Sequence, residues 1–475
     1  MCMMAVVYTA CQDDDSFSTS PSSLLTFSAD TIRLDTIFSR VPTATKTFWV
    51  YNYSGDGIRC ASVRLERGNQ TGFRVNVDGV YLGPSTGYQV NGVEVRNKDS
   101  VRVFVELTSP QMLADSPTRI EDNLVFSLEN GRQQKVNLNA FAWDADLLHD
   151  VVIDRDTTIQ TDRPIVIYGG LKIDSTATLT IGAGTTLYFH ADAGIDVYGR
   201  FICEGTAERN VVLRGDRIDH MFDYLPYDRV SGQWQGVRFH ESSYENSLNF
   251  TDIHSAMNGI VCDSASVGRL KLSLYNSVVH NCQGYGLLTT NAVLDIFNTQ
   301  LSNTLNDCLA IYGGGVMLRH CTLAQFYPFD ARRGVALRFA NNRDGHVWPL
   351  HQMDVLNSIV TGYADDVIMG EADTTVAYTY RFDHCLLRTP ALEDTVQVRD
   401  IIWEDPKDTV AGGEKNFRLI DTRNLRYDFR LDTVSRAVNA GVRLSGGYSD
   451  YDRLGVRRDE EPDLGAYESA SLMDN

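Results

Sequence analysis

The sequence lacks several features that would narrow its function at once. Its nine cysteines include no CxxC pair, which argues against a zinc knuckle or a thioredoxin-like redox site. Basic residues are outnumbered, 43 against 62 acidic ones, and the net charge is −19. No basic stripe is available to release counterions, which argues against nucleic acid as a partner. A strongly anionic polysaccharide is also disfavoured, unless metal ions or a local basic loop intervene.

The composition is otherwise ordinary for a folded protein. Hydrophobic residues make up 43% of the chain and charged residues 22%, so the protein is neither disordered nor polytopic. A length of 475 residues is too great for one small core and predicts two or three domains.

A six-residue pattern recurs in the second half of the chain. It reads apolar, any, Asn or His, small hydroxyl or thiol, any, apolar, and it occupies residues 274–279, 296–301, 318–323, 355–360 and 382–387. Its third positions are Asn276, Asn298, His320, Asn357 and His384, spaced 22, 22, 37 and 27 residues apart. A period in the low twenties with occasional insertions predicts a solenoid with one coil per repeat.

The polar positions of this pattern have two interpretations. His320 and His384 could be catalytic or could ligate a metal. Because they occupy the position that Asn holds in the other repeats, we favour a structural ladder. Coils stack about 4.8 Å apart, so side chains at one turn can hydrogen-bond to those above and below. We therefore predict no metal site here.

The first residues resemble a targeting signal. Residues 1–10 form a short apolar run that ends in Ala10, and Cys11 is followed by Gln12 and three aspartates. This order resembles the lipobox of bacterial lipoproteins, with Cys11 as the lipid attachment site and an acidic surface-export signal behind it. The resemblance implies a lipid-anchored protein on the outer-membrane surface of a Gram-negative bacterium. A cytosolic start with a solvated acidic patch is the alternative.

Residues 12–23 would then be a flexible acidic tether, and residues 24–145 a separate β-domain. Short alternating segments such as residues 101–107 are separated by turn signals, including Asp78-Gly79 and Asn91-Gly92. The segments around residues 25–38 and 101–109 resemble immunoglobulin-like domains, which implies a β-sandwich that acts mainly as a spacer.

Residues 146–470 carry the repeats. The stretches LTIGAGTTLYF and GIDVYGRFICEGTAERNVVLRG resemble the first coils of right-handed parallel β-helix proteins of the pectate-lyase-like family. The end of the chain, with Asn439-Ala-Gly441 and residues 463–468, resembles their closing cap, which would cover the last coil. The predicted fold is thus all-β: an immunoglobulin-like sandwich, then a right-handed single-stranded parallel β-helix, with residues 471–475 as a tail.

Two insertions, at residues 214–236 and about 326–352, interrupt the coils and are rich in charged and aromatic residues. In β-helix enzymes such insertions wall the sugar-binding groove. A lyase would need a Lys or Arg base near calcium-binding acids, and a glycoside hydrolase would need paired carboxylates. The catalytic candidates are Asp216, Arg217, Asp219 and Arg229.

No known catalytic motif is present, so we favour a binding or structural platform for a polysaccharide or a surface protein over an enzyme. A polysaccharide lyase or glycoside hydrolase, and an adhesin, are the alternatives. The ligand-binding candidates are Tyr227, Trp234, Arg332 and Trp348. No cofactor is predicted, because a calcium ion would suit a lyase but no calcium motif supports one.

Overall fold

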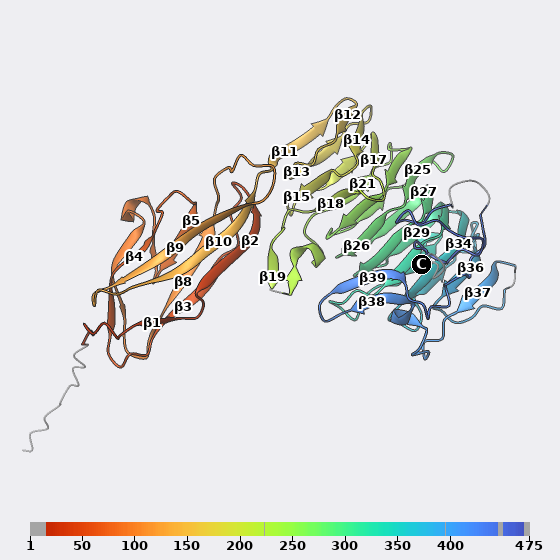
Figure 1. Cartoon of the computed structure of the whole chain (residues 1–475). Coiled ribbons are helices and arrows are strands. Elements are labelled where there is room, and N and C mark those ends of the chain that lie inside the picture. Colours follow the sequence, from red (N-terminus) through yellow and green to blue (C-terminus); the bar gives the residue numbers. More distant parts are fainter. Residues whose placement is uncertain (1–15, 223, 395, 445–449, 470–475) are drawn as a thin grey trace, which may run out of the picture. The chain divides into compact units, whose positions relative to one another are not determined.

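The computed structural model describes residues 16–222, 224–394, 396–444 and 450–469. Cys11, the first part of the predicted tether and the predicted tail lie outside these residues. The chain is all-β and divides between Asp144 and Ala145 into two compact units (Figure 1). In the part of the chain that the structure describes, no helix is long and apolar enough to cross a membrane.

The N-terminal unit contains two five-stranded sheets that share one apolar core. All strand pairs within them are antiparallel except β2–β10. Strand β8 shows why the core forms, because Val101, Val103, Val105 and Leu107 alternate inward and are buried. One sheet holds β1 (Leu25–Phe27), β3 (Lys46–Asn52), β8 (Ser100–Leu107), β5 (Phe73–Val77) and β6 (Val80–Tyr81). The other holds β2 (Thr31–Phe38), β10 (Gln133–Trp143), β9 (Thr118–Leu128), β4 (Ile58–Leu65) and β7 (Gln89–Val95), and the short helix η1 spans Pro84–Thr86.

The second unit is built on one parallel sheet of 23 strands, an arrangement consistent with the predicted solenoid (Figure 1). Its first strands are β11 (Asp146–Ile153), β12 (Thr157–Ile159), β13 (Ile165–Ile173), β14 (Thr178–Gly182), β15 (Thr186–Phe189), β16 (Ile195–Val197), β17 (Arg200–Glu204), β18 (Val211–Gly215), β21 (Val237–Phe239), β22 (Asn246–Asn249), β23 (Thr251–His254) and β24 (Ile260–Cys262). They continue as β25 (Leu270–Tyr275), β26 (Val278–Cys282), β27 (Leu287–Phe297), β28 (Gln300–Thr304), β29 (Leu309–Arg319), β30 (Thr322–Gln325), β31 (Leu337–Ala340), β34 (Leu350–Gly362), β35 (Ile368–Glu371), β36 (Arg381–Leu387) and β37 (Val398–Trp403).

The repeated pattern sets the register of this sheet. Its last apolar position forms one continuous stack, because Val279, Leu301, Leu323, Val360 and Leu387 pair in turn across five parallel strands. All five side chains are buried in the core of the unit. A shift of one residue would turn the apolar side chains of a strand away from the core, so burial fixes the register.

The third position of the pattern lies at a corner with a left-handed backbone. Asn276, Asn298, His320, Asn357 and His384 all have φ between 47° and 51°, a conformation that Asn tolerates better than most residues. Their side chains connect successive coils. Asn298 donates to Asn276 over 3.0 Å, and Asn357 and His320 are 3.0 Å apart.

The fourth position supplies a second link between coils. The hydroxyl of Ser277 accepts a hydrogen bond from the Thr251 amide over 3.0 Å, and Ser358 accepts one from the Cys321 amide over 3.0 Å. Each bond satisfies a buried backbone donor at a corner. Cysteine at this position is buried, and burial raises the pKa of the Cys321 and Cys385 thiols to about 12, so both stay protonated and unreactive.

Among the described residues, three antiparallel two-stranded sheets lie outside the parallel sheet. They are β19 (His220–Phe222) with β20 (Leu225–Pro226), β32 (Asn342–Arg343) with β33 (His346–Val347), and β38 (Phe417–Asp421) with β39 (Arg426–Leu431). The short helices η2 (Tyr227–Arg229) and η3 (Gly413–Asn416) complete the described elements. The prediction that residues 326–352 form one continuous insertion is wrong, because β31 lies within this range and pairs with β29 and β35 in the parallel sheet.

The C-terminal segment lies along the side of the coils. The amide of Gly465 donates to the carbonyl of Asn357, the amide of Ala466 to Thr322, and the hydroxyl of Tyr467 to Gln300. These three partners belong to three successive coils. The segment thus ties coils together laterally, whereas the sequence predicted a cap over the open end.

Candidate functional site

A cavity of about 600 Å³ lies on the flank of the parallel sheet. Strands β23, β26 and β28 form one wall, η2 contributes Asp228 and Arg229, and the β38–β39 hairpin with residues 453, 454 and 467 forms the other wall. Its volume falls within the range of about 300–1,000 Å³ that is usual for small-ligand sites.

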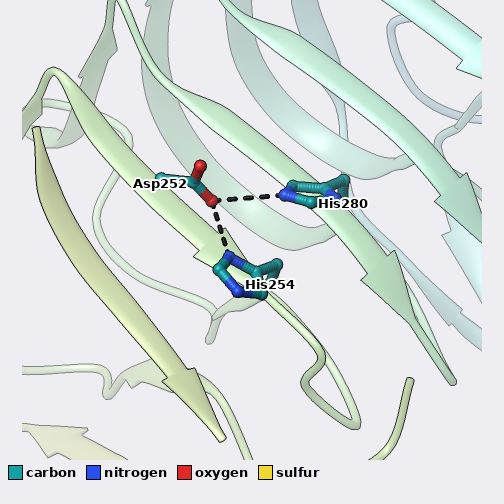
Figure 2. Close-up of side chains that lie close together, drawn as sticks. All are labelled: Asp252, His254 and His280. Carbon is teal, nitrogen blue, oxygen red and sulfur yellow. Dashed lines mark hydrogen bonds and ion pairs between the residues drawn. The ribbon is translucent and has the colours of Figure 1, made fainter. Parts of the chain in front are cut away.

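Asp252, His254 and His280 form a compact cluster (Figure 2), and Asp252 and His280 line this cavity. The register places them together: His254 on β23 pairs with His280 on β26, and Asp252 lies two residues before His254 on the same face of its strand. One carboxylate oxygen of Asp252 is 2.8 Å from Nδ1 of His254 and 3.3 Å from Nε2 of His280. The two imidazole rings lie 4.9 Å apart.

A second carboxylate holds the other nitrogen of His254. Asp228 lies 2.9 Å from Nε2 of His254, and Arg214 lies 2.5 Å from the same oxygen of Asp228. The Ser255 hydroxyl donates to the backbone carbonyl of Asp228 over 3.0 Å. His254 is therefore fixed between two carboxylates, and Asp228 is fixed by groups on β18 and beside β23.

The charges in this cluster stabilise one another. Burial disfavours the charged form of His254, but Asp252 and Asp228 outweigh burial and raise its pKa to about 9. Burial likewise disfavours ionised Asp252 and Asp228, but the neighbouring histidines, joined at Asp228 by Arg214, hold both pKa values well below their usual range. Neither carboxyl is a proton donor of the kind that glycoside hydrolysis requires.

Several buried polar atoms on the cavity residues have no hydrogen-bond partner among the described residues. They are Oδ1 of Asn303, Nε of Arg453 and the hydroxyl of Tyr427. The side chains of Asn303 and Arg453 belong to residues that are only 1% and 7% exposed. An unpaired buried polar atom costs about 1–3 kcal/mol, so a small shift of the cavity lining that lets any of these atoms meet water or a ligand would gain a hydrogen bond.

Four arginines line the cavity: Arg229, Arg426, Arg430 and Arg453. Arg430 pairs with Asp428 at 2.5 Å, and Arg453 donates to Asn210 over 2.8 Å. With three aspartates at the same cavity, the cationic side chains are in slight excess. These four arginines form a local basic patch, which an anionic ligand would need on a chain whose net charge is −19.

Of the catalytic candidates from the sequence, only Arg229 lines this cavity. Asp216 accepts from His190 at 2.7 Å. Arg217 forms two hydrogen bonds to Asp219, over 2.7 and 2.6 Å, and stacks on the ring of Tyr227. The structure thus does not bring the candidates into one site, because Arg217 and Asp219 use each other as partners.

The ligand-binding candidates are scattered too. The prediction that Trp234 binds a ligand is wrong. Its side chain is fully buried, stacks on Phe189 at 4.5 Å and donates its indole N–H to the carbonyl of His254, so no face is open to a sugar. Tyr227 lies under Arg217. The Arg332 side chain is 90% exposed, 3.6 Å from an aspartate, and Trp348 stacks on His346 on the β32–β33 side.

Sequence reasoning missed Asp228, Asp252, His254 and His280. A signal was present, because the repeated pattern extends one coil earlier: residues 248–253 match it with Phe250 in place of Asn. In that alignment His254 and His280 each follow the last apolar position, and so they share one face of neighbouring coils.

No family model matches the chain, and no curated protein matches it. Among solved structures, a partial likeness is found to a family 123 glycoside hydrolase from Clostridium perfringens, described in a study of glycolipid glycan hydrolysis. The TM-score is 0.18 with 5% identity, over 27% of this chain and 30% of that chain. The match thus spans less than a third of either protein, and so low a score supports no conclusion about function. The class defined here is an all-β protein with a large parallel sheet and a charged flank cavity.

Proposed function

We propose that this protein binds a short carbohydrate segment in the flank cavity. The observation that carries the proposal is the set of unpaired polar atoms on Asn303, Tyr427 and Arg453. Sugars present many hydroxyl groups that donate and accept hydrogen bonds, so they suit a cavity with both kinds of group. Tyr427 also offers an aromatic ring next to these polar atoms.

The arginines favour a sugar that carries a carboxylate. A guanidinium group binds a carboxylate through two parallel hydrogen bonds, which are stronger than bonds between neutral groups. We therefore expect uronic-acid oligosaccharides to bind more tightly than neutral ones. Binding without turnover is favoured, because the two carboxyls beside His254 are both ionised, so neither can act as the carboxylic acid that glycoside hydrolysis requires.

In this proposal the parallel sheet winds as a right-handed β-helix that carries the cavity on its side. The N-terminal unit is an immunoglobulin-like sandwich that acts as a spacer. Its two sheets around one core are compatible with that role. The alternative is that the protein binds a protein partner or acts as an adhesin. In that case it should bind a host or bacterial protein and should not bind free oligosaccharides.

Replacing Tyr427 with Phe tests the carbohydrate site. Among the described residues the hydroxyl is buried without a partner, so its removal should not lower the stability of the free protein. Loss of one hydrogen bond to the ligand, about 0.5–1.5 kcal/mol, should weaken binding by roughly two- to thirteenfold. Titration calorimetry with a panel of neutral and uronic-acid oligosaccharides measures both the preference and the change.

Tyr363 provides the matched control. Its hydroxyl is also buried without a partner among the described residues, but it does not line the cavity. Tyr363→Phe should bind oligosaccharide as the unmodified protein does. A wild-type protein that binds nothing in the panel, or equal affinities for all three proteins, would contradict the proposal.

The N-terminal motif adds a proposed location. Cys11, which lies outside the described residues, would carry the lipid that holds the protein at the outer-membrane surface. In the native host, Cys11→Ser should move the protein from the membrane fraction to the soluble fraction and abolish incorporation of labelled fatty acid. Unchanged fractionation of this variant would rule out the anchor, and Cys60→Ser, a change at a buried cysteine, serves as the control.

A further inference from the structure

We propose that Asp252, His254 and His280 bind a zinc ion at the wall of the flank cavity. Two imidazole nitrogens and one carboxylate oxygen form a ligand set that zinc commonly takes at open sites. The three ligand atoms lie within 4.8 Å of one another. The proposal concerns metal binding alone and does not depend on carbohydrate binding.

The distances suit one ion. Zinc lies about 2.0–2.2 Å from nitrogen and oxygen ligands, so ligand atoms around a tetrahedral ion are about 3.3 Å apart. Oδ1 of Asp252 is 3.3 Å from Nε2 of His280 and 2.8 Å from Nδ1 of His254. Figure 2 shows both imidazole rings turned toward the same carboxylate of Asp252. Small rotations of these side chains would place all three ligand atoms on one ion.

The surroundings fix which nitrogen of His254 would bind. Nε2 of His254 is 2.9 Å from Asp228, and Arg214 holds Asp228 in turn. A carboxylate that accepts the N–H of a metal-binding histidine fixes its tautomer and its ring orientation. Nδ1, which faces Asp252, is therefore the ligand atom, and the ion takes the place of the proton on it.

The side of the ion away from the protein is open. Asp252 and His280 line the cavity, whereas His254 lies behind them and is buried. Three protein ligands leave a fourth position for water or a ligand oxygen. The three protein ligands are held in place by the sheet, because all of them lie on β23 and β26, which pair directly.

A second cluster, Asp383, His384 and Asp400, is a weaker candidate. It contains one imidazole, the side chain of Asp400 is 69% exposed, and its oxygen is 3.8 Å from His384. An exposed carboxylate with one histidine holds zinc poorly compared with two fixed histidines. The cluster at the cavity is therefore the site that we assign.

Zinc titration of the full chain tests the assignment. After treatment with a chelator, the protein should bind one zinc ion per chain, seen by calorimetry and by elemental analysis after desalting. His280→Ala should weaken binding at least a hundredfold. Asp228→Asn should weaken it about 10- to 100-fold, as is usual when the carboxylate behind a metal-binding histidine is lost.

His240→Ala is the matched control, because His240 also lies between two carboxylates, Asp196 at 2.7 Å and Asp263 at 3.4 Å. It should bind zinc as the unmodified protein does. Circular dichroism checks that each variant is folded. Less than one zinc per chain at millimolar concentration, or binding that His280→Ala leaves intact, overturns the assignment.

Cobalt substitution gives an independent readout. Co²⁺ bound to two imidazoles and a carboxylate should show visible absorption bands of a four- or five-coordinate ion in the unmodified protein and lose them in His280→Ala. Weak bands typical of the hexahydrated ion in both proteins would overturn the assignment. Oligosaccharide titration with and without zinc separates the two proposals, since either ligand can bind while the other fails.

Discussion

Replacing Arg458 with Met is expected to lower the free energy of unfolding of the parallel unit by about 3–5 kcal/mol. The side chain of Arg458 is 2% exposed and lies 2.8 Å from Glu468, whose side chain is 4% exposed. It also donates to Oδ1 of Asn298 over 3.0 Å and to the Gly465 carbonyl over 2.9 Å. Without it, Glu468 is a buried carboxylate that has lost its partner.

The pair links the C-terminal segment to the ladder. Burial raises the pKa of Glu468 to about 7 even though Arg458 opposes that shift, and burial lowers the pKa of Arg458. Desolvation is therefore a large cost for both members, and each needs the other to remain charged. Loss of Arg458 should loosen the segment from Asn298 first.

Urea titration followed by circular dichroism measures the loss, and limited proteolysis reports on release of the C-terminal segment. Arg443→Met is the control, because Arg443 pairs with Glu460 in the same part of the chain with side chains 40% and 87% exposed. An exposed pair contributes only about 0–1 kcal/mol. Equal small losses for both variants would refute the role given to Arg458.

A double replacement sharpens the result. When Glu468→Gln is added to Arg458→Met, the uncompensated charge disappears, and about half of the loss or more should be recovered. Additive losses in the double variant would instead mean that the contacts of Arg458 with Asn298 and Gly465 carry the stability.

The parallel strands and their register could be predicted because each repeat of the pattern meets the same physical requirements. A tight corner needs a residue that accepts a left-handed backbone, a buried amide needs a nearby hydroxyl, and the core needs an apolar side chain. Asn298, Thr299 and Leu301 solve these three problems in one stretch, and the solution recurs in the sequence. Repetition made this part of the fold readable without a structure.

The flank cavity could not be predicted in the same way. Its groups come from η2, from the three strands β23, β26 and β28, from the β38–β39 hairpin and from residues 453, 454 and 467, which are far apart in the sequence. Only the register brings His254 beside His280, and the coil between them is 26 residues long, longer than the spacing of 22 that made the pattern visible. The C-terminal arginines were predicted to cover the end of the coils, so they were not considered for a site.

Trp234 shows a different limit of sequence reasoning. Its loop is polar and charged, so Trp234 was a candidate for ligand binding as well as for packing over the core, and residues 214–236 do contribute Asp228 and Arg229 to the cavity. Tryptophan is large enough, however, to reach from a loop into the core. The direction of the ring cannot be predicted from the sequence, but its packing against Phe189 in the structure shows that it points into the core.

Replacing Trp234 with Ala is accordingly expected to lower the free energy of unfolding of the parallel unit by about 3–5 kcal/mol, because it opens a cavity in a fully buried site. Trp234→Phe keeps a ring against Phe189 but loses the N–H bond to the carbonyl of His254 and part of the buried volume, so it should cost less, about 1–3 kcal/mol.

Urea unfolding followed by circular dichroism compares these variants with Trp348→Ala, a change at a half-buried ring beside His346 that should cost under about 2 kcal/mol. If Trp234 binds sugar through an exposed face, Trp234→Ala would abolish oligosaccharide binding at unchanged stability. If Trp234 is a core residue, Trp234→Ala should instead lower the free energy of unfolding. Trp234→Phe should then retain oligosaccharide affinity, because its replaced ring never touches the ligand.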